Sequence, residues 1–252
     1  MVRYTLTIFS SAFLLFLVQP LIARRILPEY GGTAAVWTTS LVYFQVVLLL
    51  GYLYAHLNRA WLRPRTGFAL HALLLLVACI FVPFNQLKIE SGNQGAPLAQ
   101  MIAWQLTCTV GLPFLALAAT GPLIQAWHSL THPDQQTYRL YALSNAGSLL
   151  ALIAYPFVFD RFLGLSRQSA IWSSGFLLFS ALMFVSGWQL LAKKSWEPAE
   201  PDQRSDGQEN RYPGLGEYVV WFLLSASACS LLVSTTNLLC QELAAFPFLW
   251  IL

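Results

Sequence analysis

The sequence predicts an all-α polytopic membrane protein, and three observations lead to this fold class. Apolar residues make up 57% of the 252 residues, charged residues make up only 10%, and the mean hydropathy is +0.58. Ordinary soluble domains have far more charge and less apolar surface. The apolar residues also gather in runs of about 20, the length that crosses a hydrocarbon core of roughly 30 Å as a helix.

Seven runs are long enough to span a membrane, and polar turn segments separate them. PEYGG follows the first run, RPRTG the second, ESGNQGAP the third and THPDQQ the fourth. The first run lacks a signal-peptide cleavage site, so we expect a retained helix. The fourth run is long and contains Gly111, Pro113, Gly121 and Pro122, which predict a kink. The predicted spans are 4–23, 34–57, 67–84, 98–129, 138–160, 168–192 and 218–239.

The spans divide the chain into three parts. Residues 1–192 form a six-helix membrane bundle, and residues 193–217 form a cytoplasmic linker that is polar, charged and rich in Pro and Gly. Residues 218–252 hold the seventh span and the start of an eighth at Leu243. Residues 244–252 rise only about 13 Å as a helix. We therefore expect either a longer native chain or a partner that covers this short segment.

The distribution of Lys and Arg indicates how the helices are oriented. The loops on the side of the N-terminus hold nine of these residues and the loops on the other side hold five. This excess favours a cytoplasmic N-terminus in a multi-pass protein of the bacterial inner membrane. The net charge of +3 is spread over the loops, so no nucleic-acid surface is expected.

An internal repeat relates the first three spans to the next three. Pro20-Leu21-Ile22 in the first span matches Pro122-Leu123-Ile124 in the fourth at an offset of 102 residues, and the helix lengths also correspond. Because three is an odd number, the two triplets would have opposite orientations in the membrane. The alternative is a chance match among apolar residues.

Six helices, a long linker and the start of a further set resemble the layout of the major facilitator superfamily. The segment GYLYAHLNRAWLRPRTG, residues 51–67, also resembles that superfamily's loop between helices two and three. His56 stands where that loop usually has an acidic residue, which departs from the pattern.

A closer resemblance covers nearly the whole chain. It rests on residues 18–56, TGPLIQAWH at 120–128, YRLYALSNAGSLLALIAYPF at 138–157 and STTNLLCQELAAFPFLWIL at 234–252. These segments resemble the membrane part of the bacterial fused major-facilitator/spermidine synthase-like family. In that family an aminopropyltransferase-like domain follows, which binds decarboxylated S-adenosylmethionine and a polyamine. The present sequence lacks a matching Gly-rich strand–turn–helix motif, so we expect no catalytic residues and no cofactor.

Polar side chains within the spans are candidates for a binding site because they are costly in lipid unless paired. Gln19, Gln45 and Gln105 could together line a cavity, or each could hydrogen-bond between helices. Asn145 lies among small residues, which favours helix packing over ligand contact. A second polar group, at the outer end of the seventh span, could bind cations through its oxygens or be ordinary helix-end polarity; its candidates are Asn237, Gln241 and Glu242.

His71 and the four cysteines receive structural interpretations. His71 lies near the cytoplasmic boundary of the third span, which favours an interfacial histidine over a proton relay. The cysteines fall in apolar runs without close pairing, so we expect neither disulfides nor a metal site.

Two functions remain open on the sequence. One is a non-catalytic scaffold or accessory subunit that packs against other membrane protein subunits within the lipid bilayer. The other is a transport or binding module for a small cationic metabolite such as a polyamine, with two helix triplets rocking about a midplane cavity. A third possibility, the membrane part of a fused synthase-like enzyme, requires a catalytic domain that this sequence does not contain.

Overall fold

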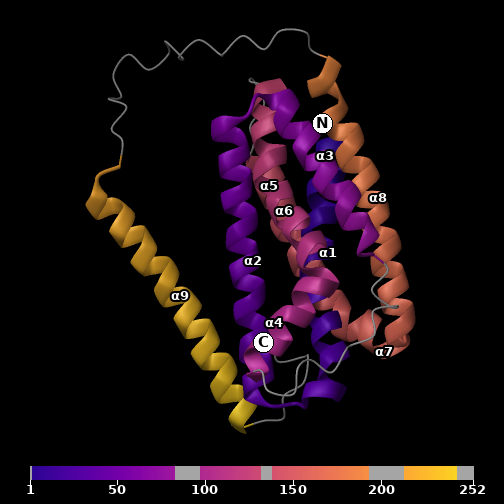
Figure 1. Ribbon diagram of the computed structural model, residues 1–252, viewed down its shortest axis with the longest axis vertical. Coiled ribbons are helices and arrows are strands. Elements are labelled where there is room, and N and C mark those ends of the chain that lie inside the picture. The colour runs from indigo at the N-terminus through magenta and orange to yellow at the C-terminus, as the bar shows by residue number, and fades with distance from the viewer. Residues whose placement is uncertain (1, 83–96, 132–137, 193–212, 243–252) are drawn as a thin grey trace.

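The computed structural model describes residues 2–82, 97–131, 138–192 and 213–242, and helices dominate all four segments (Figure 1). Six helical segments are long and apolar enough to cross a membrane, and α3 is a shorter apolar helix. The chain is therefore a multi-pass membrane protein by the length and composition of its helices. This confirms the predicted all-α polytopic class.

The first two spans are single helices joined by a tight turn. α1 covers Val2–Tyr30 and α2 covers Ala34–Trp61. Gly31 adopts a positive φ of 80°, which ends α1 in the left-handed conformation that glycine accepts without steric cost. α1 extends beyond the predicted end at residue 23. The charged residues Arg24, Arg25 and Glu29, which follow the apolar stretch, are also helical.

The third span follows a turn that proline shapes. α3 covers Pro64–Ile80, with Arg63 as N-cap and Pro64 in the first turn, where its missing N–H removes no helical bond. Its 17 residues make it shorter than the other spans. The predicted end at residue 84 lies outside the described residues.

The fourth and fifth spans each contain a π-helical turn. α4 (Leu98–Leu106), η2 (Thr107–Gly111) and α5 (Leu112–Thr131) form the fourth span. α6 (Tyr138–Ala154), η3 (Tyr155–Phe159) and α7 (Asp160–Phe162) form the fifth. The predicted break in the fourth span therefore occurs as a π-turn just before Pro113. α8 covers Leu165–Ala192 and is the sixth span.

α1 and the fourth span form the centre of the bundle. α1 packs against α6, α8 and α5, while α2 packs against α5 and α4. α3 lies against α5 and α8 at the other side of the fourth span (Figure 1). Large apolar side chains fill the core between these helices, including Leu17, Leu21, Phe114, Trp172 and Phe176.

Two glycines let helices of the bundle approach each other closely. A β-carbon at Gly51 of α2 would lie 2.6 Å from the β-carbon of Ala118 in α5. A β-carbon at Gly147 of α6 would lie 2.8 Å from the carbonyl oxygen of Phe9 in α1. Any larger residue would push these helices apart, so the glycines set the α2–α5 and α1–α6 crossings.

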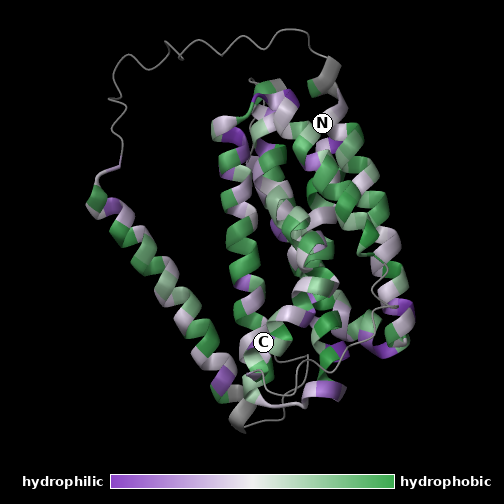
Figure 2. Cartoon of the chain, in the orientation of Figure 1, coloured by the Kyte–Doolittle hydropathy of each residue, from purple (hydrophilic) through white to green (hydrophobic). Residues whose placement is uncertain are grey.

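α9 covers Leu215–Glu242 and stands apart from the bundle (Figure 1). Its main packing partner is α2, which its C-terminal end approaches. Most described side chains of α9 are exposed, although the helix is apolar along most of its length (Figure 2). α9 contains the predicted seventh span and begins within the predicted linker, whereas the predicted eighth span lies outside the described residues.

Candidate functional site

A cavity of about 390 Å³ lies where four helices meet, and we call it the four-helix cavity. α1, α2, α5 and α6 each contribute to its wall. α6 contributes four residues at helical spacing, so they share one face: Tyr141, Ser144, Asn145 and Ser148. The remaining lining residues are Ser11, Ala12, Leu15, Phe16, Leu48, Tyr52, Leu117, Ala118, Gly121, Pro122 and Gln125.

The polar groups of this cavity are amides and hydroxyls. The Ser11 hydroxyl donates to the Ile8 carbonyl at 2.9 Å, and the Ser148 hydroxyl donates to the Asn145 carbonyl at 2.8 Å. Both hydroxyl oxygens therefore keep lone pairs that can accept hydrogen bonds from a ligand. The amides of Gln125 and Asn145 can both donate and accept, and Tyr52 and Tyr141 add two aromatic rings with hydroxyl groups.

Two prolines each remove a backbone hydrogen bond at a residue of the same wall. Pro20 has no N–H for the Phe16 carbonyl, and Pro122 has none for the Ala118 carbonyl. Phe16 and Ala118 both line the cavity. The paired Pro-Leu-Ile segments thus leave one carbonyl each without its helical partner at cavity-lining residues of α1 and α5.

The described residues that line the four-helix cavity carry no charged side chain. The wall offers hydrogen-bond donors, acceptors and aromatic surface, but no carboxylate or ammonium group. Such a wall suits a small, polar, uncharged molecule. A charged molecule would lose its hydration on entering the cavity and would find no side chain of opposite charge there.

The predicted site residues are distributed over the bundle. Asn145 is exposed and lines the four-helix cavity, and Gly147, two residues further on, provides the helix contact. Gln19 is half-buried and its side-chain amide donates to the Leu15 carbonyl of its own helix at 3.4 Å. Gln45 is half-buried and Gln105 is buried, and none of these three glutamines lines the four-helix cavity.

The second predicted polar group lies on α9. Asn237 is half-buried, and its neighbour Thr236 is buried. Gln241 and Glu242 end α9, but their side chains lie outside the described part of the structure. The expected cation site at this helix end therefore stays a prediction.

The sequence interpretation missed Gln125, Tyr52, Tyr141, Ser144 and Ser148. A signal for the α6 residues was present, because positions 141, 144, 145 and 148 repeat with the spacing of one helix face. Gln125 lies three residues after Pro122 and so shares its face of α5.

His71 is buried inside the bundle, and its expected position near the membrane interface stays a prediction. It is 0% exposed and packs beside Tyr54 and Trp127, at ring-centroid distances of 5.9 and 6.2 Å. Within the described residues neither ring nitrogen has a hydrogen-bond partner. α3 packs against α5, and residue 71 lies on the side of α3 that faces α5. This position explains the burial of the His71 side chain.

An ion pair joins the first and fifth spans at the end of the bundle opposite the N-terminus. Arg24 of α1 donates to Asp160 of α7, and both side chains are partly exposed. One helical turn away from Arg24, the Tyr155 hydroxyl donates to the Pro20 carbonyl at 3.2 Å. These two contacts hold α1 against the fifth span at one end. The close approach at Gly147 keeps the same two spans together further along their length.

The described residues contain no group of three or more potential metal-binding side chains. Comparison of the sequence with protein-family models, with curated proteins and with solved structures found no match. The cavity and its lining are therefore the basis for a functional assignment.

Proposed function

We propose that this chain is a solute-binding module of a facilitator-type transporter, with the four-helix cavity as its binding site. The observation that carries the proposal is the cavity wall, where amides and hydroxyls converge from four helices, beside two lining residues whose carbonyls lack their helical N–H donor. Transporter sites often combine such partly unpaired backbone groups with helices from two related repeats. The favoured ligand is a small, polar, uncharged solute.

The packing of the helices supports a relation between two inverted triplets. Exchanging spans one, two and three with spans four, five and six leaves the set of main contacts unchanged. The α1–α6 contact corresponds to the contact of α2 with the fourth span, and α1–α8 corresponds to α3–α5. The contacts of α1 with α5 and of α3 with α8 each map onto themselves. Such a pattern is what a two-fold axis in the membrane plane would produce.

A small cationic metabolite is the less favoured ligand. A polyamine carries several charges, and transferring these into a cavity without a carboxylate costs free energy that hydroxyls and amides only partly offset. Two tyrosine rings, from Tyr52 and Tyr141, could still hold a single ammonium group by cation–π contact. Polyamines therefore belong in the same transport assay as polyols, sugars and amides.

The test is uptake and binding by the purified protein in liposomes. Asn145→Leu and Gln125→Leu should each weaken binding of the transported solute about five- to ten-fold, since each removes hydrogen bonds to it. Gln45→Leu is the matched control, because Gln45 is a half-buried amide on α2 and does not line the cavity. If no solute in the panel binds, or if Gln45→Leu has the same effect as the cavity variants, the proposal fails.

A second candidate function is a scaffold that packs against another membrane protein, and α9 favours it. This helix is apolar and long enough to span a membrane, yet most of its described side chains are exposed. Lipid or a protein partner must cover them. Purification in mild detergent tests this function: a partner that stays bound and is lost when residues 213–242 are removed supports it, and a monodisperse monomer that binds solute counts against it.

We infer that the N-terminus is cytoplasmic. The inference rests on the nine Lys and Arg residues of the N-terminal side against five on the other. The helices alternate in direction along the bundle (Figure 1), so the ends assigned to each side do lie together.

A further inference from the structure

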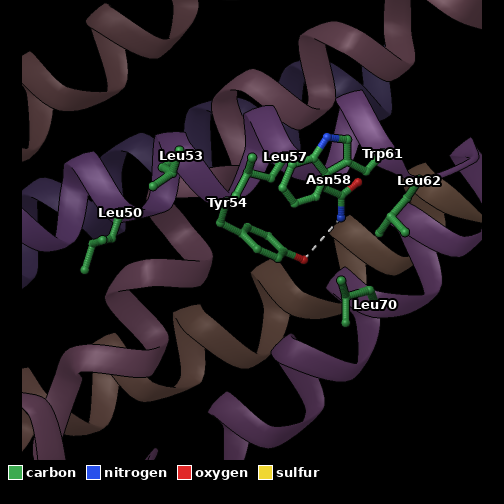
Figure 3. Close-up of a pocket in the computed structure, with 8 residues that line it drawn as sticks. All are labelled: Leu50, Leu53, Tyr54, Leu57, Asn58, Trp61, Leu62 and Leu70. Atoms are coloured by element: carbon green, nitrogen blue, oxygen red, sulfur yellow. Dashed lines mark hydrogen bonds between the residues drawn. The ribbon is translucent and has the colours of Figure 1, made fainter.

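An apolar groove of about 330 Å³ lies between α2 and α3, at the end of the bundle that carries the N-terminus (Figure 3). We call it the α2–α3 groove. Leucines form most of its wall, and Tyr54 and Asn58 lie between them (Figure 3). Its lining residues are Leu50, Leu53, Tyr54, Leu57, Asn58, Trp61, Leu62 and Leu70.

The length of the groove matches one leaflet of a bilayer. Trp61 is 78% exposed at the end of α2, a position where tryptophan marks the level of the lipid headgroups. Leu50 lies eleven residues earlier in the same helix, roughly 16 Å deeper along the helix axis. Half of a hydrocarbon core of roughly 30 Å is about the same depth. A chain lying in the groove would thus run from the headgroups to the middle of the membrane.

A rigid helix junction preforms the groove. Asn58 is only 5% exposed, and its side-chain amide donates to the Gly67 carbonyl at 3.0 Å and to the Tyr54 hydroxyl at 3.4 Å. A β-carbon at Gly67 would collide with the Asn58 side-chain oxygen, so glycine permits this contact. The junction holds the end of α2 against the start of α3, and the groove does not have to form on binding.

Positive charge borders the groove without an acidic neighbour in the sequence. Arg63 directly follows Leu62, which lines the groove, whereas Arg59 lies on the face of α2 opposite Leu50, Leu53 and Leu57. Both arginines are exposed. Residues 30–89 contain no Asp or Glu, so no carboxylate of this segment neutralises them. Guanidinium groups bind phosphate through paired, charge-assisted hydrogen bonds.

We propose that the α2–α3 groove is a binding site for one anionic phospholipid. An acyl chain lies along the leucines, and the phosphate of the headgroup contacts Arg63. The acyl chain gains little by leaving bulk lipid, because lipid tails are as apolar as leucine side chains. Discrimination between lipids must therefore come from the headgroup, where each arginine near the surface contributes about a five-fold preference for negative charge.

The headgroup is tested by native mass spectrometry of the purified protein with added phosphatidylglycerol or phosphatidylcholine of identical acyl chains. Wild-type protein should retain phosphatidylglycerol about five-fold more strongly. Arg63→Gln should weaken phosphatidylglycerol binding roughly five-fold and leave phosphatidylcholine unchanged. Arg139→Gln is the matched control, since it removes an exposed charge from the same end of the bundle, on α6.

The acyl chain is tested by filling the groove. Leu53→Trp and Leu70→Trp change partly exposed lining residues, so the core stays intact, and each should reduce retention of phosphatidylglycerol several-fold. Leu73→Trp, at an exposed position of α3 outside the lining, should not. Glycerol phosphate, which has no acyl chain, should not compete. Equal retention of the two lipids by wild-type protein, or an equal loss with Arg139→Gln, would overturn the proposal.

Discussion

Gly51 sets how closely α2 and α5 pack, and its substitution tests this contact. In Gly51→Ala the new β-carbon would lie 2.6 Å from the Ala118 β-carbon and 3.2 Å from the Leu115 carbonyl oxygen. Neither atom is the free end of a flexible side chain, so the helices must separate. We expect the free energy of unfolding to fall by about 1–3 kcal/mol, measured by unfolding in detergent with circular dichroism.

Gly121→Ala is the control for this variant. Gly121 also lies in α5, but a β-carbon there meets no atom within 4 Å. Alanine favours the helix over glycine by up to about 1 kcal/mol, so the stability should stay level or rise. Equal losses in the two variants would show that the α2–α5 crossing does not depend on Gly51.

His71 and Asn58 are both buried polar residues, but among the residues that the structure describes Asn58 has side-chain hydrogen-bond partners and His71 has none. His71→Phe should change the free energy of unfolding by less than about 1 kcal/mol, because it removes an unpaired polar ring and adds modest volume. Asn58→Leu should cost about 1 kcal/mol or more, since it loses the bonds to Gly67 and Tyr54. Unfolding of both variants in one detergent checks the contrast. A large loss with His71→Phe would indicate a partner for this ring.

Only some of the individual residues that line the cavity could be predicted from the sequence. Asn145 was among the candidates because an amide within a span is unusual, and it does line the four-helix cavity. Gln125 and Tyr52 were missed because their role depends on how α5 and α2 are rotated about their axes. Hydropathy reports that a residue lies in a span, but it does not report which neighbouring helix the residue faces.

α9 depends little on the bundle, and the bundle should depend little on α9. Its main packing partner is α2, and most of its described side chains are exposed. We expect a chain of residues 1–192 to insert in membranes and to unfold within a few degrees of the full chain, because α1–α8 keep their packing. Thermal unfolding followed by size-exclusion chromatography measures this. Aggregation of the shortened chain would show instead that α9 stabilises the bundle.

Helices as elements were largely predictable from composition, and their irregularities were not. The six long spans each correspond to an apolar run, because a lipid environment leaves the backbone few alternatives to helix. The break near Gly111 and Pro113 was predicted, but its π-helical form was not. A π-turn accommodates one extra residue per turn, and sequence patterns do not show whether neighbouring helices will tolerate it.

The arrangement of the whole molecule predicts opposite membrane sides for two exposed positions. Arg63 lies between α2 and α3, and Gly164 lies between α7 and α8, with three spans between them. In a cysteine-free background, a membrane-impermeant maleimide added to intact cells should label Gly164→Cys and not Arg63→Cys. Permeabilised cells should label both. Labelling of both from outside would contradict the alternating spans, and the reverse pattern would place the N-terminus outside.

The tertiary arrangement was the least predictable level. The match between Pro20-Leu21-Ile22 and Pro122-Leu123-Ile124 suggested related triplets, and this relation stays a prediction with which the contacts among the spans are compatible. The four-helix cavity itself could not be located from the sequence, because it requires the relative depth and rotation of four helices. Small differences in crossing, such as those at Gly51 and Gly147, decide whether space remains between them.

The prolines of the two Pro-Leu-Ile segments have a consequence for how the cavity wall can change during evolution. Recognition by a side chain is lost with one substitution at that side chain. The freed carbonyls of Phe16 and Ala118 belong to the backbone, so substitutions at Phe16 or Ala118 themselves leave these acceptors in place. Only the loss of Pro20 or Pro122, four residues away, would supply the missing N–H and return the carbonyls to their helices.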